Sequence, residues 1–245
     1  PPVFAHVPMI LAPDRSKLSK RHGATSVEEF REQGYLPEAI VNYLCLLGWS
    51  ARDQNDIFPP EDAIRQFSFE RVSKNAAIYD TKKLTWINGH YLKNSDIDRI
   101  AGLAVPFLAA KGLVPASGIS GEQREKIKSV IGLVREKVWT LAEIADASSY
   151  FFTGDFLYEE KGVEKYFKNE GIPRIFSDIY NIVKNIEPFD KEELEAQYRA
   201  CAEARGIKAG DMIHPTRLAL TGRIVSPGLF EVMELLGRDE CLKRL

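Results

Sequence analysis

The chain has 245 residues, of which 44% are hydrophobic and 28% are charged, and its formal net charge at pH 7 is −2. This length allows one large or two to three small domains with real hydrophobic cores. The near-neutral charge argues against a protein that coats nucleic acid by charge alone, so any such binding would come from local basic patches. The cysteines are isolated, which predicts reduced thiols and no metal site in this chain.

The start of the sequence indicates a piece of a longer protein. It opens without methionine on a β-like run, residues 3–11, which would need neighbouring strands for pairing. No apolar run reaches the roughly 18 residues of a membrane-spanning helix, and no secretion signal precedes the first run. We therefore expect a cytoplasmic fragment.

A basic loop follows this run. Four cations, Arg15, Lys17, Lys20 and Arg21, stand against a single nearby acid, Asp14. Such a cation density in a loop that also carries serine and glycine suits a polyphosphate ligand. Charge alone leaves open a loop that is simply solvated, because most basic clusters are.

Two short helices are predicted after the loop. Ser26 begins the capping-box sequence SVEE, and this helix should end at Gly34. Pro37 suits the first turn of the next helix, which ends before residue 48. Its predicted buried face consists of Ile40, Val41, Leu44 and Leu47.

The middle of the chain adds two further helices. Residues 58–60 break the chain, 61–67 read as a short helix, and 80–92 read as a longer one that contains Trp86. We expect Trp86 to lie in the core; the alternative is a platform on which an RNA base stacks.

The second half is a series of capped helices. An N-terminal acceptor is expected at Ser95, Ser120, Thr140 and Asp190. The aromatic run at 150–155 should close one small bundle, and we place a boundary near residue 160.

The last pattern covers residues 215–237. Ser226 is expected to cap a helix that has Pro227 at its first position. Its apolar face is predicted to consist of Leu229, Val232, Met233 and Leu236.

Several of these stretches resemble one family. Residues 17–26 read KLSKRHGATS, which resembles the second signature loop of class I aminoacyl-tRNA synthetases in the form found in bacterial-type glutamyl-tRNA synthetases. The flanking sequences HVPMIL before the loop, and GYLPEA, NYL and LGWS after it, are similar to the same family. Residues 80–92 resemble a helix of its tRNA stem-contact region.

The resemblance implies a mainly α-helical C-terminal fragment. It would comprise the end of the catalytic domain with the stem-contact region, 1–100, and two helical anticodon-binding subdomains, 101–160 and 161–245. The parent enzyme would use ATP with Mg²⁺ to form glutamyl-adenylate and then transfer glutamate to tRNA(Glu).

The resemblance also implies site residues in the loop. Lys20 would stabilise charge on the departing pyrophosphate, assisted by Lys17 and Arg21, and Ser19 would help to hold the ATP phosphates while Gly23 lets the loop close. Lys17 and Lys20 are thus the candidate catalytic residues.

The resemblance places anticodon contacts near the other end of the chain. Arg217 would contact a base, with Ser226, Pro227 and Leu229 as the supporting turn; a plain structural ion pair is the alternative for Arg217. The third anticodon base would be read at Lys137, which lacks the planar fork of arginine. Either Lys137 still makes the contact, or Arg135 does, or the enzyme also accepts tRNA(Gln).

The first class I signature, a His-x-Gly-His turn, is missing, because His6, His22, His90 and His214 do not form it. We therefore expect this chain alone to be inactive in adenylation and to hold tRNA. The competing class is a helical protein-interaction module that carries a basic loop.

Overall fold

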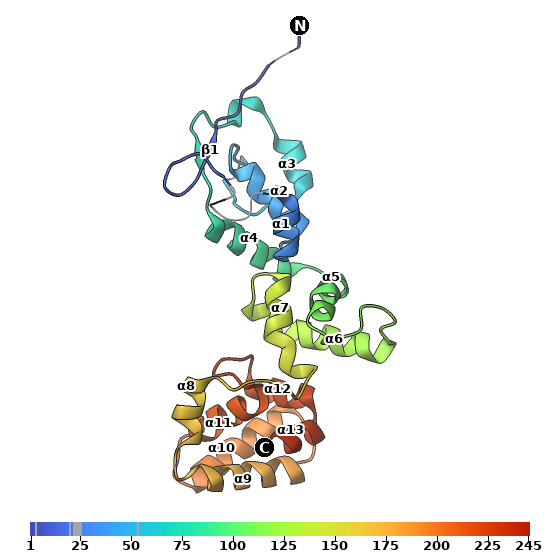
Figure 1. Ribbon diagram of the computed structural model, residues 1–245, viewed down its shortest axis with the longest axis vertical. Coiled ribbons are helices and arrows are strands. Elements are labelled where there is room, and N and C mark those ends of the chain that lie inside the picture. Colours follow the sequence, from blue (N-terminus) through green and yellow to red (C-terminus); the bar gives the residue numbers. More distant parts are fainter. Residues whose placement is uncertain (3, 20, 22–25, 53) are drawn as a thin grey trace. The chain divides into compact units, whose positions relative to one another are not determined.

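The computed structural model describes residues 1–2, 4–19, 21, 26–52 and 54–245. It separates into two compact units, which are treated one at a time below. The N-terminal unit consists of Pro1–Phe107 and Val138–Ile144, and the C-terminal unit of Leu108–Lys137 and Ala145–Leu245. Helices dominate both units, so the predicted mainly α fold is confirmed (Figure 1).

The N-terminal unit combines short helices with two short parallel strands. The strands pair Ile10 with Ala77 and Leu11 with Ile78. In chain order the elements are β1 (Ile10–Leu11), α1 (Val27–Glu32), α2 (Pro37–Leu46), α3 (Pro60–Gln66), a 3₁₀ turn (Phe69–Arg71), β2 (Ala77–Ile78), α4 (Thr81–Asn94) and α5 (Ile97–Ala110), most of which belongs to this unit.

The first strand is shorter than predicted. A β-like run was expected over 3–11, but pairing is found only at Ile10 and Leu11. Hydrophobic alternation shows which residues favour a strand, whereas the length of a strand depends on the partner available. The only partner strand in the described part of the chain is β2, which is two residues long.

The predicted capping box of α1 is confirmed. The Ser26 hydroxyl accepts from the Glu29 amide at 3.2 Å, and the Glu29 carboxylate accepts from the Ser26 amide at 3.0 Å. Past the helix end, Gly34 has a φ of +83°, and a Cβ there would lie 2.5 Å from the Ala142 nitrogen. Glycine is therefore required where the 138–144 segment packs against the chain.

The buried face of α2 differs from the prediction. Ile40 is buried as expected, but Val41 and Leu44 are 43% and 50% exposed. Asn42 is buried instead: its amide donates to the Asp56 carbonyl at 2.9 Å, and its Oδ1 accepts from the Phe58 amide at 3.2 Å and from a tyrosine hydroxyl. A polar residue that is fully hydrogen-bonded can be buried, so the helix turns a face to the core that apolar spacing did not reveal.

Helix α4 is capped by Asp80, and it exposes its tryptophan. The Asp80 carboxylate accepts from the amides of Lys82 and Lys83. Asn88 is buried and accepts from the Leu36 amide at 2.7 Å. Trp86 is 47% exposed, so the prediction that it belongs to the core is wrong.

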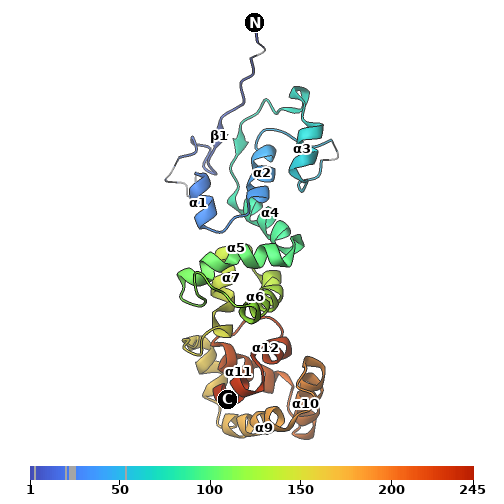
Figure 2. The same ribbon diagram turned by 90° about the vertical axis from the view of Figure 1, so that its right-hand side faces the viewer.

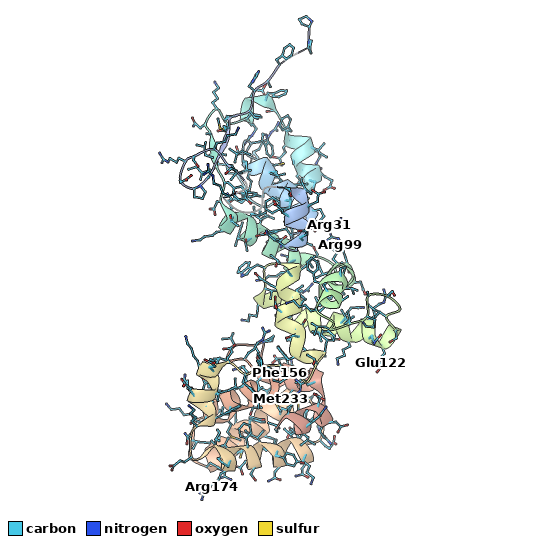
Figure 3. All side chains as sticks on the ribbon, in the orientation of Figure 1. Arg31, Arg99, Glu122, Phe156, Arg174 and Met233 are labelled. Carbon is cyan, nitrogen blue, oxygen red and sulfur yellow. The ribbon has the colours of Figure 1, made fainter. Side chains whose placement is uncertain are left out.

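Residue 99 joins two helices of the same unit. The Arg99 guanidinium (labelled in Figure 3) binds both carboxylate oxygens of Glu38 at 2.7 and 2.9 Å. Such a bidentate pair fixes α5 against the start of α2.

The C-terminal unit is a group of packed helices. Figures 1 and 2 both show α9, α10, α11 and α12 side by side. Its elements are α6 (Gly121–Val134), a 3₁₀ turn (Arg135–Lys137), part of α7 (Leu141–Ser148), a 3₁₀ turn (Ser149–Phe151), α8 (Glu160–Gly162), a π-helical turn (Val163–Phe167), α9 (Ile172–Asn185), α10 (Lys191–Ala204), α11 (Gly210–Thr221), α12 (Leu229–Leu236) and α13 (Arg238–Arg244).

Large apolar side chains from these helices meet in one core. Met233 of α12 is fully buried in it (Figure 3), together with side chains from α9, α10 and α11. Leu229 and Val232 are buried as predicted, and Leu236 packs at the margin.

Three predicted caps are confirmed. Ser120, Thr140 and Asp190 each accept from the backbone amide three residues later. The predicted cap at Ser95 is wrong, because the Asp96 carboxylate accepts from the next helix while the Ser95 hydroxyl donates back to α4. An acid directly after a serine can place the cap one residue later, and sequence alone does not decide between the two positions.

The predicted cap at Ser226 is also wrong. Helix α12 begins at Leu229, and Gly228 precedes it. The Ser226 hydroxyl is instead engaged with Arg217 and with the Pro227 carbonyl. The serine thus closes a turn before the helix begins.

The aromatic run after α7 is held in place by one arginine. Tyr150 and Phe151 are buried, as the expected closure requires. Arg244 donates to the carbonyls of Tyr150 at 2.9 Å, Leu220 at 2.7 Å and Thr153 at 3.4 Å. Its side chain is only 7% exposed. One guanidinium therefore satisfies carbonyls from two distant segments.

Within the described part of the chain, we find no helix of the length and apolar character needed to span a bilayer.

Candidate nucleic-acid interface

The base of the basic loop is an ordered turn. The Ala12 amide donates to the Ser16 carbonyl at 2.8 Å, and the Leu18 amide returns to the Ile10 carbonyl at 3.3 Å. Arg15 adopts a φ of +64° within this turn. The Asp14 carboxylate accepts from the amide and hydroxyl of Ser16, so the single acid of the loop is used to shape it.

The predicted site residues of the loop differ in their exposure to solvent. Lys17 and Arg21 are exposed, and Ser19 is half-buried. Lys17 forms no ion pair with any described residue. Lys20 and Gly23 lie outside the described residues. Two of the predicted cations therefore face solvent beside a fixed turn.

Arg217 occupies the centre of a second cluster, on α11. Its Nε donates to the Ser226 hydroxyl at 3.0 Å, and its Nη1 lies 3.5 Å from His214 Nδ1. The guanidinium is half-buried, and burial lowers the pKa of Arg217. No carboxylate among the residues with described positions pairs with it, so a structural ion pair does not explain this arginine.

An aromatic pair next to Arg217 was missed by the sequence reasoning. The rings of Tyr166 and His214 stack with centroids 5.4 Å apart and an interplanar angle of 19°. The Lys165 ammonium lies 5.0 Å from the centroid of Tyr166. Burial, followed by the charges of Arg217 and Lys165, lowers the pKa of His214.

The location of this pair explains why it was missed. Tyr166 belongs to a π-helical turn, Val163–Phe167, and such turns have no reliable sequence signature although they are common at functional sites. The only available signal was the spacing of His214 and Arg217, which places both side chains on one face of a helix.

The turn after α11 brings Ser226 to Arg217. Gly222 has a φ of +72°, and a Cβ there would lie 2.5 Å from the Leu157 carbonyl oxygen. Pro227 and Leu229 are buried. Their side chains can thus set the shape of the turn while the hydroxyl of Ser226 faces the arginine.

Lys137 lies in the same unit, on the 3₁₀ turn after α6. The side chain of Lys137 is exposed and makes no hydrogen bond with Arg217. Its neighbour Arg135 is half-buried, with its Nε 3.9 Å from the Glu136 carboxylate.

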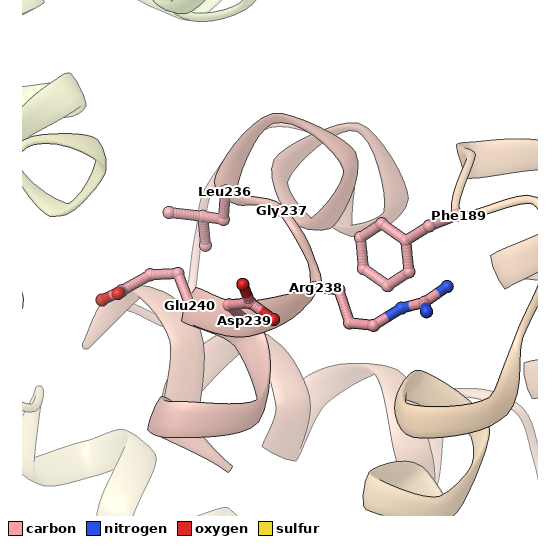
Figure 4. Close-up of a pocket in the computed structure, with 6 residues that line it drawn as sticks. All are labelled: Phe189, Leu236, Gly237, Arg238, Asp239 and Glu240. Atoms are coloured by element: carbon pink, nitrogen blue, oxygen red, sulfur yellow. The ribbon is translucent and has the colours of Figure 1, made fainter.

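A hollow elsewhere in the C-terminal unit is lined by none of the predicted site residues. It measures about 530 Å³ and lies at the start of α13, lined by Phe189 and by Leu236 to Glu240 (Figure 4). Arg238 lies over the Phe189 ring at 5.4 Å and pairs with Glu187 at 2.8 Å. The cation of this hollow is thus already engaged by the protein.

Metal ligands are not gathered in this chain as far as its residues are described: no group of three or more histidine, cysteine or acidic side chains is placed to hold an ion.

Comparison with protein families covers almost the whole chain. Residues 1–86 match the catalytic domain of class I tRNA synthetases (E and Q), and residues 99–245 match the anticodon binding domain. The chain therefore belongs to the class I tRNA synthetases that carry a helical anticodon-binding domain.

Within that class, the relatives are bacterial glutamate–tRNA ligases, which confirms the family expected from the signature loop. The chain is 59% identical to the glutamate–tRNA ligase of Moorella thermoacetica and 53% identical to glutamate–tRNA ligase 1 of Caldanaerobacter subterraneus subsp. tengcongensis. Each comparison covers 100% of this chain and 50% of the relative, so the chain spans about half the length of the curated relatives it matches.

Solved structures agree with this grouping. A crystal structure of a glutamate tRNA ligase from Elizabethkingia meningosepticum, in complex with its amino acid, matches with a TM-score of 0.86 and 28% identity. The match covers 100% of this chain and 50% of that one. A glutamate-tRNA synthetase from Elizabethkingia anophelis matches with a TM-score of 0.83.

Proposed function

We propose that this chain is the tRNA-binding part of a glutamate–tRNA ligase and that its own task is to hold tRNA(Glu) through the anticodon. The observation that carries this proposal is Arg217, a half-buried cation held by a neutral hydroxyl and lying beside a stacked tyrosine–histidine pair. Proteins read RNA sequence mainly in unpaired loops, where bases stack on aromatic rings and expose their edges to hydrogen-bond donors. Arg217 keeps such donors, because no acid consumes them in the described residues.

The proposed roles follow from this arrangement. Arg217 contacts the edge of an anticodon base, Ser226 orients the guanidinium, and Pro227 and Leu229 shape the turn that carries Ser226. His214 is held uncharged near neutral pH by its lowered pKa, so it offers a flat neutral ring to a base.

For the whole protein we propose attachment of glutamate to tRNA(Glu) in two ATP-dependent steps through glutamyl-adenylate, with ATP and Mg²⁺ as cofactors. Lys20 would stabilise negative charge on the departing pyrophosphate, with Lys17, Ser19 and Arg21 at the ATP phosphates. Lys17, an exposed cation on the ordered turn, fits this task, since a preorganised donor stabilises developing charge without first reorganising.

We further propose the three-part division predicted above, 1–100, 101–160 and 161–245, and a cytoplasmic protein. Lys137 is proposed as the position that meets the third anticodon base. Because its point charge discriminates less sharply than a guanidinium fork, a non-discriminating enzyme that also charges tRNA(Gln) is the second candidate function.

The test is binding of the 245-residue chain to transcripts of tRNA(Glu), tRNA(Gln) and an unrelated tRNA at one stated salt concentration. Arg217→Ala is expected to weaken binding of tRNA(Glu) by about five- to a hundredfold, the value of one good contact to a base edge. The matched control is Arg199→Ala, since Arg199 is an exposed arginine of the same unit that is already paired with Glu195.

Each result has a defined meaning. Preference for tRNA(Glu) that only Arg217→Ala abolishes supports a discriminating enzyme, and equal binding of tRNA(Glu) and tRNA(Gln) above the unrelated tRNA supports the second candidate. Equal weak binding of all three favours a helical interaction module and overturns the proposal. Separately, the chain alone should show no ATP–pyrophosphate exchange with glutamate; exchange would contradict the assignment of adenylation to the whole protein.

A further inference from the structure

The contact between His214 and Arg217 defines the protonation state of the histidine. The Arg217 Nη1 lies 3.5 Å from the His214 Nδ1. A guanidinium carries only donors, so the two atoms form a hydrogen bond only when Nδ1 has no proton. A neutral imidazole has one proton, which must then lie on Nε2. The contact therefore requires His214 to be neutral and to have its proton on Nε2.

A second element keeps the imidazole in this orientation. The ring of Tyr166 stacks on the ring of His214, with centroids 5.4 Å apart and an interplanar angle of 19°. Tyr166 belongs to the π-helical turn Val163–Phe167, which packs on α11. Stacking restricts rotation of the imidazole, so less side-chain entropy is lost when a ligand arrives. His214 thus offers Arg217 a preorganised acceptor.

The guanidinium of Arg217 is held at two of its nitrogens. Its Nε donates to the Ser226 hydroxyl at 3.0 Å, and its Nη1 faces His214. Ser226 alone would leave the planar fork free to turn about a single hydrogen bond, whereas two attachments fix its plane. Both partners are neutral when His214 is unprotonated, and a guanidinium has five N–H donors. The arginine therefore keeps its charge and further donors for a ligand.

The charges around His214 oppose its protonation. The groups that act on it are Arg217 and Asp211 from its own helix, and Lys165 and Tyr166 from the π-helical turn. Two of them are cations, and the carboxylate of Asp211 already accepts from a backbone amide at 3.1 Å. Burial and these cations lower the pKa of His214. A proton on Nδ1 would set two donors and two positive charges against each other.

We propose that neutral His214 is a positioning residue that holds the Arg217 guanidinium for tRNA, and that protonation of His214 releases it. Acid then weakens tRNA binding through this pair. The inference rests on the proposed function in one respect, the identity of the ligand, because the contact itself is a property of the free chain. The sign is diagnostic, since an added positive charge ordinarily strengthens RNA binding.

The first measurement needs no RNA. Nitrogen NMR of the full chain reports the tautomer and the titration of His214. We expect the proton on Nε2 at neutral pH. Arg217→Ala removes a cation and a donor that favour the neutral ring, so it should raise the pKa of His214 toward its ordinary value. Arg199→Ala, an exposed arginine of the same unit that pairs with Glu195, should leave the titration unchanged.

The second measurement is the affinity of the full chain for tRNA(Glu) transcript at about pH 7.5 and about pH 5, at one salt concentration. His214→Gln keeps a side-chain acceptor that does not titrate, so it should bind as the wild type does at the higher pH. At the lower pH the wild type should bind about two- to tenfold more weakly than this variant, the value of one hydrogen bond.

A variant without an acceptor completes the test. His214→Leu should bind about two- to tenfold more weakly than the wild type already at the higher pH. In an Arg217→Ala background the same substitution should have no further effect, because the histidine acts only through the arginine. Circular dichroism checks that each variant is folded at both pH values.

The outcomes separate this inference from the proposed function. If Arg217→Ala weakens tRNA binding while the wild type and His214→Gln respond equally to pH, the inference is overturned and the proposed function stands. If the chain ignores tRNA but Arg217→Ala shifts the titration of His214, the proposed function fails and the holding of Arg217 by His214 stands. A titration that Arg217→Ala leaves in place, or an affinity that rises on acidification through His214, overturns the inference.

Discussion

The two units bury polar side chains in different ways. In the N-terminal unit, Asn42 and Asn88 are buried and each bonds to segments far away in the sequence. In the C-terminal unit, the hydroxyls of Thr216 and Thr221 are buried but donate to the carbonyl four residues earlier in the same helix. The N-terminal unit is therefore cross-linked by buried asparagines, whereas in the C-terminal unit the long-range polar links come from Arg244 and from the Tyr198 hydroxyl, which lies 3.4 Å from that of Thr216.

The largest expected effect concerns the apolar core. Met233→Ala removes a fully buried side chain from α12 and should lower the free energy of unfolding of the C-terminal unit by about 2–5 kcal/mol. All three tryptophans lie in the N-terminal unit, so their fluorescence reports that unit alone. In urea unfolding, the variant should shift the circular dichroism transition and leave the fluorescence transition in place; a shift of both would show that the units unfold together.

The second prediction tests the cross-link in the N-terminal unit. Asn88→Leu leaves the Leu36 amide and the Trp139 carbonyl without their partner and should destabilise this unit by about 2–4 kcal/mol. Here the fluorescence transition should move. Asn94→Ala is the control, because Asn94 is an exposed asparagine of α4 that bonds only within its helix. An equal effect of both variants would refute the special role of the buried amide.

Helix caps should contribute equally in the two units. Asp96→Ala should cost about 1 kcal/mol of unfolding free energy in the N-terminal unit, and Ser120→Ala should cost about 1 kcal/mol in the other. Both residues accept from the amide three residues later. Ser95→Ala should cost less than Asp96→Ala. If denaturant unfolding shows a larger loss of unfolding free energy for Ser95→Ala than for Asp96→Ala, Ser95 is the cap, as the sequence predicted.

The smallest effect depends on pH and belongs to the C-terminal unit. Burial and neighbouring cations lower the pKa of His214 from its ordinary value of 6.5. Between the lowered and the ordinary pKa the unfolded chain binds more protons than the native one, so stability falls as the pH drops through about 6.5. His214→Gln should flatten this dependence in melting temperatures measured by circular dichroism. An unchanged pH profile would show that His214 is not its source.

These contrasts explain which features could be predicted from sequence. Helices and most caps depend on neighbours three or four residues away, and Ser26, Ser120 and Asp190 were placed correctly for that reason. The face of α2 and the exposure of Trp86 depend on segments tens of residues away, and these predictions failed.

The candidate site divides in the same way. Family resemblance singled out Arg217 and Ser226, which the structure brings together at 3.0 Å. Tyr166 could not be predicted, because its place beside His214 results from a π-helical turn packed on α11. Stacking between side chains of different helical segments depends on how those segments pack, and it leaves no periodicity in the sequence.

The contacts of Arg244 also impose an order on folding. Its guanidinium reaches carbonyls 24 and 94 residues earlier in the chain. These bonds form only after α13 has docked, and during synthesis the chain emerges with its N-terminal side first. The carbonyls of Tyr150 and Leu220 are therefore satisfied by this guanidinium only once α13 is in place.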